Sequence, residues 1–335
     1  MPKKRPARPV VARNARAKKK RRLRFVVARK APSKRSAIST KPPFGYYGAK
    51  QRLAAQIIET LPPHNAWVEA FCGSAAITLA KHQVPIEVIN DRDGNIVNLF
   101  QQLRNNHKAL ISAVALTPYA RQEFINAGVR KKKLTSLERA RRFLAKTMMT
   151  VNGDAKGAGF SQSSSYARRG MEARVGRWHN LPDRLSEIAE RLRGVRVESL
   201  DARRLLEMFL DRPATLIYLD PPYFVKRAHE YVIDANDIDF HRELLELCCR
   251  AQCMILISGY DTPLYKKMLR AKDGWKRVAI KTHTRDTKGK DYIRNEVLWQ
   301  NKNFVKAAKL GRVPVRLSKA EKRNDKVNPQ RARSR

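Results

Sequence analysis

The residues best suited to chemistry are the four consecutive ones Asp220-Pro221-Pro222-Tyr223, which directly follow an apolar run at Thr215–Leu219. Open parallel sheets bind ligands at the C-terminal ends of their strands, so this is where a site is expected. The prolines have no N–H donor and leave carbonyl groups that accept hydrogen bonds. With the Asp220 carboxylate they can accept both hydrogens of an exocyclic amino group on a planar ring, and Tyr223 can stack on that ring. The plainer interpretation is an Asp-Pro turn that ends a strand.

A second candidate is the segment Trp67-Val-Glu-Ala-Phe-Cys-Gly-Ser-Ala-Ala, in which an apolar strand leads through small residues into a helix. Gly73 and the small residues after it allow the backbone to come close to a ligand. The segment lacks the pattern Gly-x-Gly-x-x-Gly, so it gives little support to a dinucleotide site.

Asp91 lies in Ile89-Asn-Asp-Arg-Asp, 18 residues beyond Gly73 and after the next apolar run. An acid at the end of a second strand is suited to hydrogen bonding with both hydroxyls of a ribose. The alternative role for Asp91 is the N-cap of a helix over Gly94–Asn105, and both roles are compatible.

A fourth candidate is Pro43-Phe-Gly-Tyr-Tyr-Gly-Ala-Lys50, where aromatic residues and glycines precede a lysine. Such a loop can wrap an amino-acid group, with the Lys50 ammonium available for a carboxylate. By itself the segment is equally compatible with a surface loop.

These candidates need a sheet to position them, and the hydrophobic pattern predicts one. Short apolar runs recur at residues 67–71, 85–89, 195–200, 215–219 and 254–258. Segments of helical period separate them, at residues 50–61, 75–82, 95–105 and 240–251. Strands that alternate with helices favour an α/β fold with a mostly parallel sheet. Residues 105–194 contain no convincing strand and several basic helical stretches, so they are interpreted as an insertion.

The charge of the chain indicates a polyanionic partner. Its 335 residues carry 71 Lys and Arg against 30 Asp and Glu, a net charge of +41. Residues 1–40 contribute +16 without one acid, and residues 302–335 contribute +10, which leaves +15 for the middle. Both ends are expected to be disordered basic tails. For residues 1–40 three interpretations stay open: a DNA-tethering arm, a compartment address, and an upstream stretch wrongly included in the reading frame.

Several classes of protein are disfavoured by the sequence. The four cysteines contain no Cys-x-x-Cys pair, so a zinc site is not expected. No apolar run has the length of a membrane span, and the N-terminus lacks the apolar stretch of a secretory signal. The expectation is a cytoplasmic protein of bacterial or phage origin, associated with the nucleoid through DNA.

Taken in order, these motifs resemble the Dam-like family of adenine-N6-specific DNA methyltransferases. Two later segments, Ile255-Leu-Ile-Ser-Gly-Tyr and Arg294-Asn-Glu-Val-Leu-Trp, match as well, so the resemblance runs from about Lys41 to Asn301. It implies a methyltransferase catalytic domain that uses S-adenosylmethionine and has a Rossmann-like sheet, formed by residues 41–104 and 195–301. It also implies an inserted helical target-recognition domain at residues 105–194. In two places this chain differs from the commoner pattern: Gly73-Ser-Ala replaces Gly-x-Gly, and Ala70 replaces a proline.

The resemblance also assigns roles to residues. Asp220, Pro221, Pro222 and Tyr223 hold and activate the target adenine in double-stranded DNA. The residues that line the site of the methyl donor are Tyr46, Lys50, Phe71, Gly73, Asp91, Asp201 and Asp220. Arg168 and Arg169 in the insertion are expected to contact DNA. No metal is implied, and the oligomeric state stays open.

Two alternatives remain open at this point. Adenine in RNA and the amide of a protein glutamine need the same kind of acceptor, so a methyltransferase for either is the second enzymatic hypothesis. A basic DNA-binding protein with an inactive methyltransferase core is a hypothesis of a different class.

Overall fold

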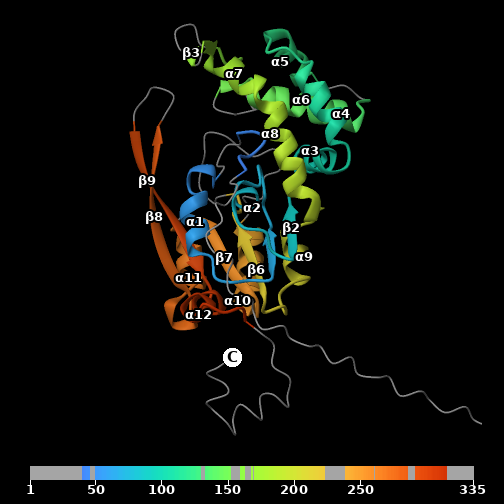
Figure 1. Ribbon diagram of the computed structural model, residues 1–335. Helices are drawn as coiled ribbons and strands as arrows, with labels where there is room; N and C mark the ends of the chain where they lie inside the picture. The colour runs from blue at the N-terminus through green and yellow to red at the C-terminus, as the bar shows by residue number, and fades with distance from the viewer. Residues whose placement is uncertain are drawn as a thin grey trace, which may run out of the picture. The chain divides into compact units, whose positions relative to one another are not determined.

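A seven-stranded sheet in the order β5-β2-β1-β6-β7-β9-β8 forms the centre of the protein (Figure 1). The computed structural model describes residues 40–45, 50–129, 133–151, 159–162, 167–168, 170–222, 238–259, 261–285 and 291–314, all within the unit Ser36–Arg335. The sheet strands are β1 (Ala66–Glu69), β2 (Ile86–Asn90), β5 (Val195–Glu198), β6 (Thr215–Leu219), β7 (Met254–Gly259), β8 (Lys276–Arg285) and β9 (Asp291–Gln300). The prediction of an α/β fold with a mostly parallel sheet is therefore confirmed.

The order of the strands reverses between β1 and β6. From β1 the chain continues outward to β2 and β5, and from β6 it continues to β7 on the other side. β1 and β6 pair directly in parallel, with Val68 opposite Ile217 and Glu69 opposite Tyr218. Such a switch point opens a crevice at the carboxyl ends of the strands, where α/β sheets bind ligands. The residues after Glu69 and after Leu219 therefore lie at the expected centre of a site.

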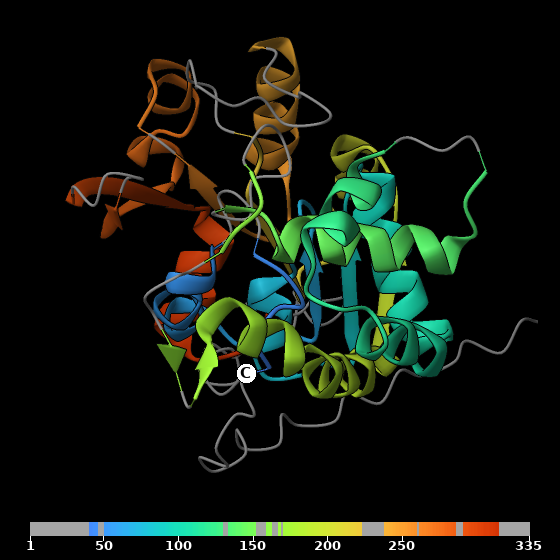
Figure 2. The same ribbon diagram turned by 90° about the horizontal axis from the view of Figure 1, so that it is seen from above.

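Helices cover both faces of the sheet because alternate residues of each strand point to opposite sides. Val68, Ile217 and Ile255 pack with α9 (Ala202–Glu207), α10 (Ile238–Arg250) and α11 (Pro263–Met268). Trp67, Tyr218 and Leu256 pack with the helices of the other face, α1 (Ala54–Thr60), α2 (Ala76–Ala80) and α12 (Lys302–Leu310). Viewed from above, the orange helices α10 and α11 lie across the sheet from the blue α1 and the red α12 (Figure 2).

The segment between α3 (Gly94–Asn105) and β5 is mostly helical, as expected for the insertion. It contains α4 (His107–Ala115), α5 (Arg121–Gly128), α6 (Ser136–Met148), α7 (Ala173–His179) and α8 (Leu181–Arg191). Figure 1 shows α4 to α7 beyond the arrowheads of the parallel strands. A two-residue antiparallel pair, β3 (Ala167–Arg168) with β4 (Met171–Glu172), is an addition to the predicted helices.

The described residues of the insertion share their hydrophobic core with the sheet. Leu144 of α6 and Ile188 of α8 belong to one buried cluster with Ile89 of β2 and Leu99 of α3. The side chains that join the insertion to the sheet are thus part of the same packed interior, which limits independent movement of the two.

Two elements near the C-terminus differ from the prediction. The tail was expected to begin at residue 302, but α12 occupies Lys302–Leu310 and buries Phe304 and Ala307 against the sheet. Asn301 caps this helix by accepting a hydrogen bond from the Phe304 N–H. The high lysine content concealed an amphipathic helix. Strand β8 was not predicted, whereas the closing strand expected around Arg294 is β9.

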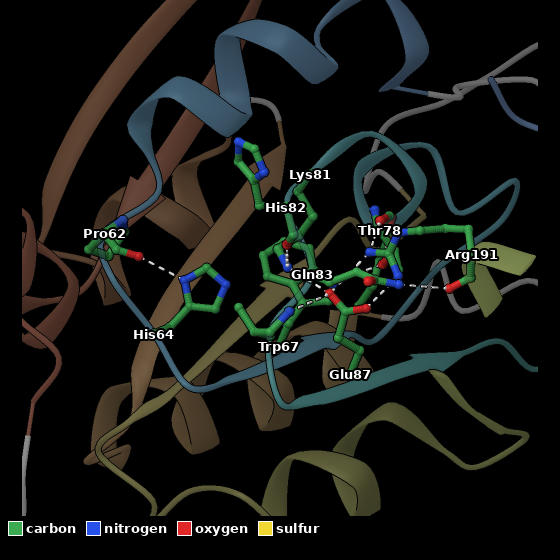
Figure 3. A network of polar contacts seen from close by, with 11 residues as sticks. Pro62, His64, Trp67, Thr78, Lys81, His82, Gln83, Glu87 and Arg191 are labelled. Atoms are coloured by element: carbon green, nitrogen blue, oxygen red, sulfur yellow. Dashed lines mark hydrogen bonds and ion pairs between the residues drawn. The ribbon is translucent and has the colours of Figure 1, made fainter. Parts of the chain in front are cut away.

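A buried ion-pair network fixes α8 to the sheet (Figure 3). The Glu87 carboxylate of β2 lies 2.6 Å from Arg191 Nη1 and 2.8 Å from Lys81 Nζ. Arg191 Nη2 also donates to the Thr78 carbonyl of α2, at 2.6 Å. Burial alone raises the pKa of Glu87, but the hydrogen bonds from Arg191 and Lys81 outweigh it, so the pKa lies below its ordinary value. Glu87 is therefore an anion shared by two buried cations.

We expect Glu87→Ala to lower the free energy of unfolding by roughly 3–5 kcal/mol, because it leaves two buried cations without their anion. Glu190→Ala is the matched control, since Glu190 pairs with Arg193 on the exposed surface of α8. Its expected effect is about 0–1 kcal/mol. Urea unfolding of the two variants measures the difference, and equal losses would contradict a role of this network in stability.

Candidate active site

The loop that follows β1 is tied to both neighbouring strands. The Ala70 N–H donates to the Tyr218 carbonyl of β6 at 3.0 Å, and the Cys72 N–H donates to the Asn90 carbonyl of β2 at 2.8 Å. The Asn90 side chain donates to the Ala70 and Leu200 carbonyls and accepts from the Leu200 N–H. Asn90 thus holds together the loops after β1, β2 and β5. Asn90 was not among the predicted site residues, although it directly precedes Asp91.

Two residues in this loop have left-handed backbone conformations. Gly73 has φ +47°, which a glycine adopts without strain. Ala75 has φ +54° and ψ +37° and immediately precedes α2. It stands at the second position of the Gly-x-Gly pattern, so the structure gives a physical reason for a glycine there. The loop keeps the left-handed turn with alanine, at a cost of about 1–2 kcal/mol.

Asp91 joins the end of β2 to the glycine loop. Its Oδ2 accepts from the Gly73 N–H at 2.8 Å, and its Oδ1 accepts from the Asp93 N–H at 2.9 Å. Burial raises the pKa of the Asp91 carboxyl to about 6. The N-cap of α3 is Asp93, which accepts from the Asn95 N–H, so the alternative role of Asp91 as that cap is wrong.

Lys50 lies against Asp220 and not in an exposed loop. Its Nζ is 2.8 Å from Asp220 Oδ1 and 3.4 Å from Glu296 Oε1, and the Lys50 side chain is only 7% exposed. Asp220 directly follows β6, Glu296 belongs to β9, and Lys50 begins the 3-10 turn η1 (Lys50–Arg52). The structure therefore brings together Lys50 and Asp220, two residues that are 170 positions apart in the sequence. Glu296 was not among the predicted site residues, although it lies in the segment Arg294-Asn-Glu-Val-Leu-Trp that supports the family resemblance.

Glu69 is a further carboxyl group at this edge of the sheet. It ends β1, opposite Tyr218, and accepts hydrogen bonds from the N–H and the hydroxyl of Thr78. The Thr78 hydroxyl in turn accepts from Trp67 Nε1 at 2.7 Å. Burial raises the pKa of Glu69 to about 7, and the charge of Asp220 also raises it. The site thus contains an acidic group that titrates near neutral pH.

The other predicted site residues have diverse surroundings. Phe71 is half-buried and packs edge-on against Phe240, with ring centroids 6.3 Å apart. Pro221 is buried and Pro222 is half-buried beside Asp220. Asp201 caps α9 and pairs with Arg203 at 2.7 Å, and the hydrogen bonds from Arg203 hold the pKa of Asp201 below its ordinary value.

Some of the predicted residues lie outside the described residues. They are Tyr46, Tyr223 and Arg169, and for Arg168 only the backbone strand is described. Within the described ranges, no three His, Cys, Asp or Glu side chains gather in a way that could hold a metal ion. In the same ranges, every helix is too short or too polar to cross a membrane.

The family of the chain follows from comparison with known proteins. Residues 46–308 match the family model of the D12 class of N6 adenine-specific DNA methyltransferases. The chain belongs to this family. Membership implies that this methyltransferase methylates N6 of adenine in DNA and uses S-adenosylmethionine as the methyl donor.

Comparisons with curated protein sequences and with solved structures give no further identification. A search of curated protein sequences finds no match. Among solved structures, a Haemophilus influenzae protein described as a methylase is 11% identical with a TM-score of 0.32, over 76% of this chain and 88% of the other. A SAM-dependent methyltransferase from Agrobacterium tumefaciens is also 11% identical, with a TM-score of 0.31, over 75% of this chain and 59% of the other.

The described residues fit the methyl donor. Gly73 brings the backbone to the edge of β1 without a side chain, and its N–H fixes one oxygen of Asp91. The half-buried Asp91 carboxylate is weakly stabilised in its charged form, since the partial burial raises its pKa, and the two hydroxyl donors of a ribose would compensate for this.

We expect Ala75→Gly to be more stable than Ala76→Gly by about 2–3 kcal/mol, because it relieves the left-handed conformation while Ala76→Gly weakens α2. Both substitutions remove one buried methyl group from adjacent positions, 0% and 4% exposed, so the loss of packing is similar. Only Ala75 has a positive φ, and only Ala76 lies within α2. Thermal or urea unfolding measures the pair. Because glycine at Ala76 also destabilises α2 by roughly 0.5–1 kcal/mol, a difference of only that size would show that the left-handed conformation of Ala75 carries no strain.

Proposed function

We propose that this methyltransferase acts on an adenine that is flipped out of double-stranded DNA at a specific sequence, and that Asp220 and the Pro221 carbonyl receive its amino group. The observation that carries the proposal is the position of Asp220, at the switch point next to the loop of Gly73 and Asp91. A base inside the duplex cannot reach this edge of the sheet, so flipping at a cost of a few kcal/mol is required.

Asp220 makes the amino group nucleophilic. The N6 lone pair of adenine is delocalised into the ring, and hydrogen bonds from both N–H groups to Asp220 and Pro221 localise it on the nitrogen. When bound, S-adenosylmethionine supplies a methyl group activated by a positively charged sulfur. The nitrogen lone pair forms the new N–C bond as the methyl–sulfur bond breaks and its electron pair stays on sulfur. The methylated amine then loses one proton to the Asp220 carboxylate and on to solvent. Positioning supplies most of the acceleration.

The remaining site residues are assigned to the methyl donor. We assign Asp91 to the ribose hydroxyls, the Gly73 loop with Phe71 to the floor of the site, and Asp201 to the neighbourhood of the donor adenine. Asp201 already pairs with Arg203 and lies 3.5 Å from Arg92. Its negative charge is therefore shared with two arginines, and its contribution is to fix the backbone at the end of β5. Tyr46 and Tyr223 keep their predicted roles beside the donor and the target base.

Asp220→Asn should reduce the single-turnover rate of methyl transfer by at least 100-fold, because the amide has only one acceptor oxygen and cannot take up the proton. Affinity for the donor and for DNA should change less than about threefold. The measurement is transfer of labelled methyl to a duplex with one target site, with donor affinity from calorimetry. A rate near that of the wild type would exclude Asp220 as the acceptor of the amino group.

The DNA interface is proposed to include Arg174, Arg177 and Arg184 of α7 and α8, beside the predicted Arg168 and Arg169. Among the described residues, Nε and Nη2 of Arg184 are buried without a hydrogen-bond partner. Burial lowers the pKa of Arg177, and the neighbouring charge of Arg174 lowers it further. Burial likewise lowers the pKa of Arg184, and the charge of Arg177 lowers it further. Glu187 is an acid that acts on Arg184, but it does not offset the burial and the neighbouring Arg177, so the pKa of Arg184 stays lowered. A cluster of neighbouring cations of this kind is suited to a polyanion such as the phosphate backbone.

We expect Arg177→Gln and Arg184→Gln each to weaken DNA binding and to reduce the slope of log affinity against log salt by roughly 1. The stability of the free protein should not fall, since each substitution relieves repulsion between arginines. Arg193→Gln is the control, because Arg193 is exposed and paired with Glu190. A salt titration on cognate and random duplexes tests this, and unchanged slopes for both variants would place the phosphate contacts elsewhere.

The partners and the location are proposed from the same electrostatics. Residues 1–39 and 315–335 are rich in lysine and arginine and lie outside the described residues. We propose that residues 1–40 form a DNA-tethering arm, which adds affinity without sequence preference. Residues 105–194 are proposed as the target-recognition domain, and the protein as nucleoid-associated in a bacterial or phage-infected cytoplasm.

A further inference from the structure

Glu296 reaches the active site from β9, which runs antiparallel to both of its neighbours in the sheet, β7 and β8. In the antiparallel pairing of β9 with β7, Val297 lies opposite Gly259, the last residue of β7. Glu296 is one position further, so it lies beyond the carboxyl end of β7, the edge at which Asp220 follows β6. Its side chain is only 9% exposed.

One oxygen of Glu296 receives two donors. The Ser258 hydroxyl of β7 donates to Glu296 Oε1 at 2.7 Å, and Lys50 Nζ lies 3.4 Å from the same oxygen. The Lys50 ammonium is simultaneously 2.8 Å from Asp220 Oδ1. A flexible lysine side chain has about 2 kcal/mol of rotamer entropy, and here two carboxylates from two strands restrict it to one position.

We infer that Glu296 is a positioning residue: it holds the Lys50 ammonium against Asp220, so that the electrostatic balance of Lys50 and Glu296 sets the ionisation of the acceptor carboxylate. The inference rests on the role of Asp220 proposed above. Lys50 then serves Asp220 as its counter-ion, in place of the predicted role as a ligand of the donor carboxylate.

The surroundings of Asp220 explain why a counter-ion is needed. Glu69 from β1, Tyr218 from β6, Tyr265 from α11 and Glu296 from β9 all face the same region. Burial raises the pKa of Glu69, Tyr218 and Tyr265, and the charge of Asp220 raises each of them further. Among the described residues, the cation within salt-bridge distance of Asp220 is Lys50. Buried carboxylates close to each other cannot all ionise unless a positive charge lies between them. Lys50 supplies that charge, and Glu296 fixes where it lies.

The experiment is a pH profile of single-turnover methylation on pre-bound DNA for the wild type, Lys50→Met, Glu296→Gln and the double variant. Lys50→Met removes the cation. The acid limb of the profile, where the rate falls as the pH is lowered, should therefore move by about one pH unit or more to higher pH. Glu296→Gln removes a neighbouring anion, so the limb should move to lower pH, while the plateau rate falls about tenfold because Lys50 loses its second anchor. The acid limb of the double variant should lie between those of the two single variants. Glu296→Asp should restore the wild-type limb.

Two controls separate this inference from other outcomes. Glu190→Gln removes a surface carboxylate from α8 and should leave the limb in place. Ser258→Ala removes a donor to Glu296 without removing charge, so it should lower the plateau without moving the limb. Calorimetry should give donor affinities within about threefold of the wild type for Lys50→Met and Glu296→Gln.

A purely structural Glu296 would lower the rate with an unmoved limb, and this overturns the inference. Loss of donor affinity by tenfold or more in Lys50→Met, without a shift of the limb, also overturns it and returns Lys50 to the donor carboxylate. If Lys50→Met does not fold, the limb of Glu296→Gln alone decides. An active Asp220→Asn, in contrast, refutes the proposed role of Asp220 itself, so the two failures are distinguishable.

Discussion

The direct parallel pairing of β1 with β6 is the constraint on which the site depends. Because these strands lie side by side, the glycine loop after β1 and Asp220 after β6 emerge at the same edge. The pairing of β1 with β2 brings Asp91 to the other side of that loop. Each motif is short and ordinary by itself. This strand order places the glycine loop, which we propose binds the donor, next to Asp220, which we propose accepts the amino group.

The same constraint concentrates acids in a buried place. Glu69, Asp91, Asp220 and Glu296 all lie at the carboxyl edge of the sheet, and burial raises the pKa of the first two to about 7 and about 6. A chain with a net charge of +41 nevertheless places only Lys50 within salt-bridge distance of Asp220 among the described residues. Net charge therefore says little about the electrostatics of the site. We propose that the excess of arginine and lysine acts on DNA, whereas in the described part of the site the cation beside Asp220 is the buried Lys50.

Much of the fold was predictable from sequence because periodicity reports burial directly. Buried parallel strands have continuous apolar runs, so five strands were found, and Asp220 was singled out by the strand that precedes it. The roles of single polar residues were less predictable. Asp91 and Asp93 are both plausible caps in the sequence, and only backbone geometry shows that Asp93 caps α3. Lys50, Asp220 and Glu296 meet through long-range pairing that no local pattern encodes, and α12 was concealed by its lysines.

The way the insertion is anchored bears on how a base reaches the site. Arg191 at the end of α8 is held by the buried Glu87 of β2, and Ile188 of the same helix shares a hydrophobic cluster with Ile89. Separating α8 from the sheet would expose this cluster and break a buried ion pair, at a cost of several kcal/mol. Asp220 is equally fixed, because it directly follows a fully buried central strand and pairs with Lys50. With α8 and Asp220 both held in place, we expect the DNA to cover the distance between the duplex and the proposed acceptor. Extrusion of the adenine costs only a few kcal/mol, so it is the less expensive of the two movements.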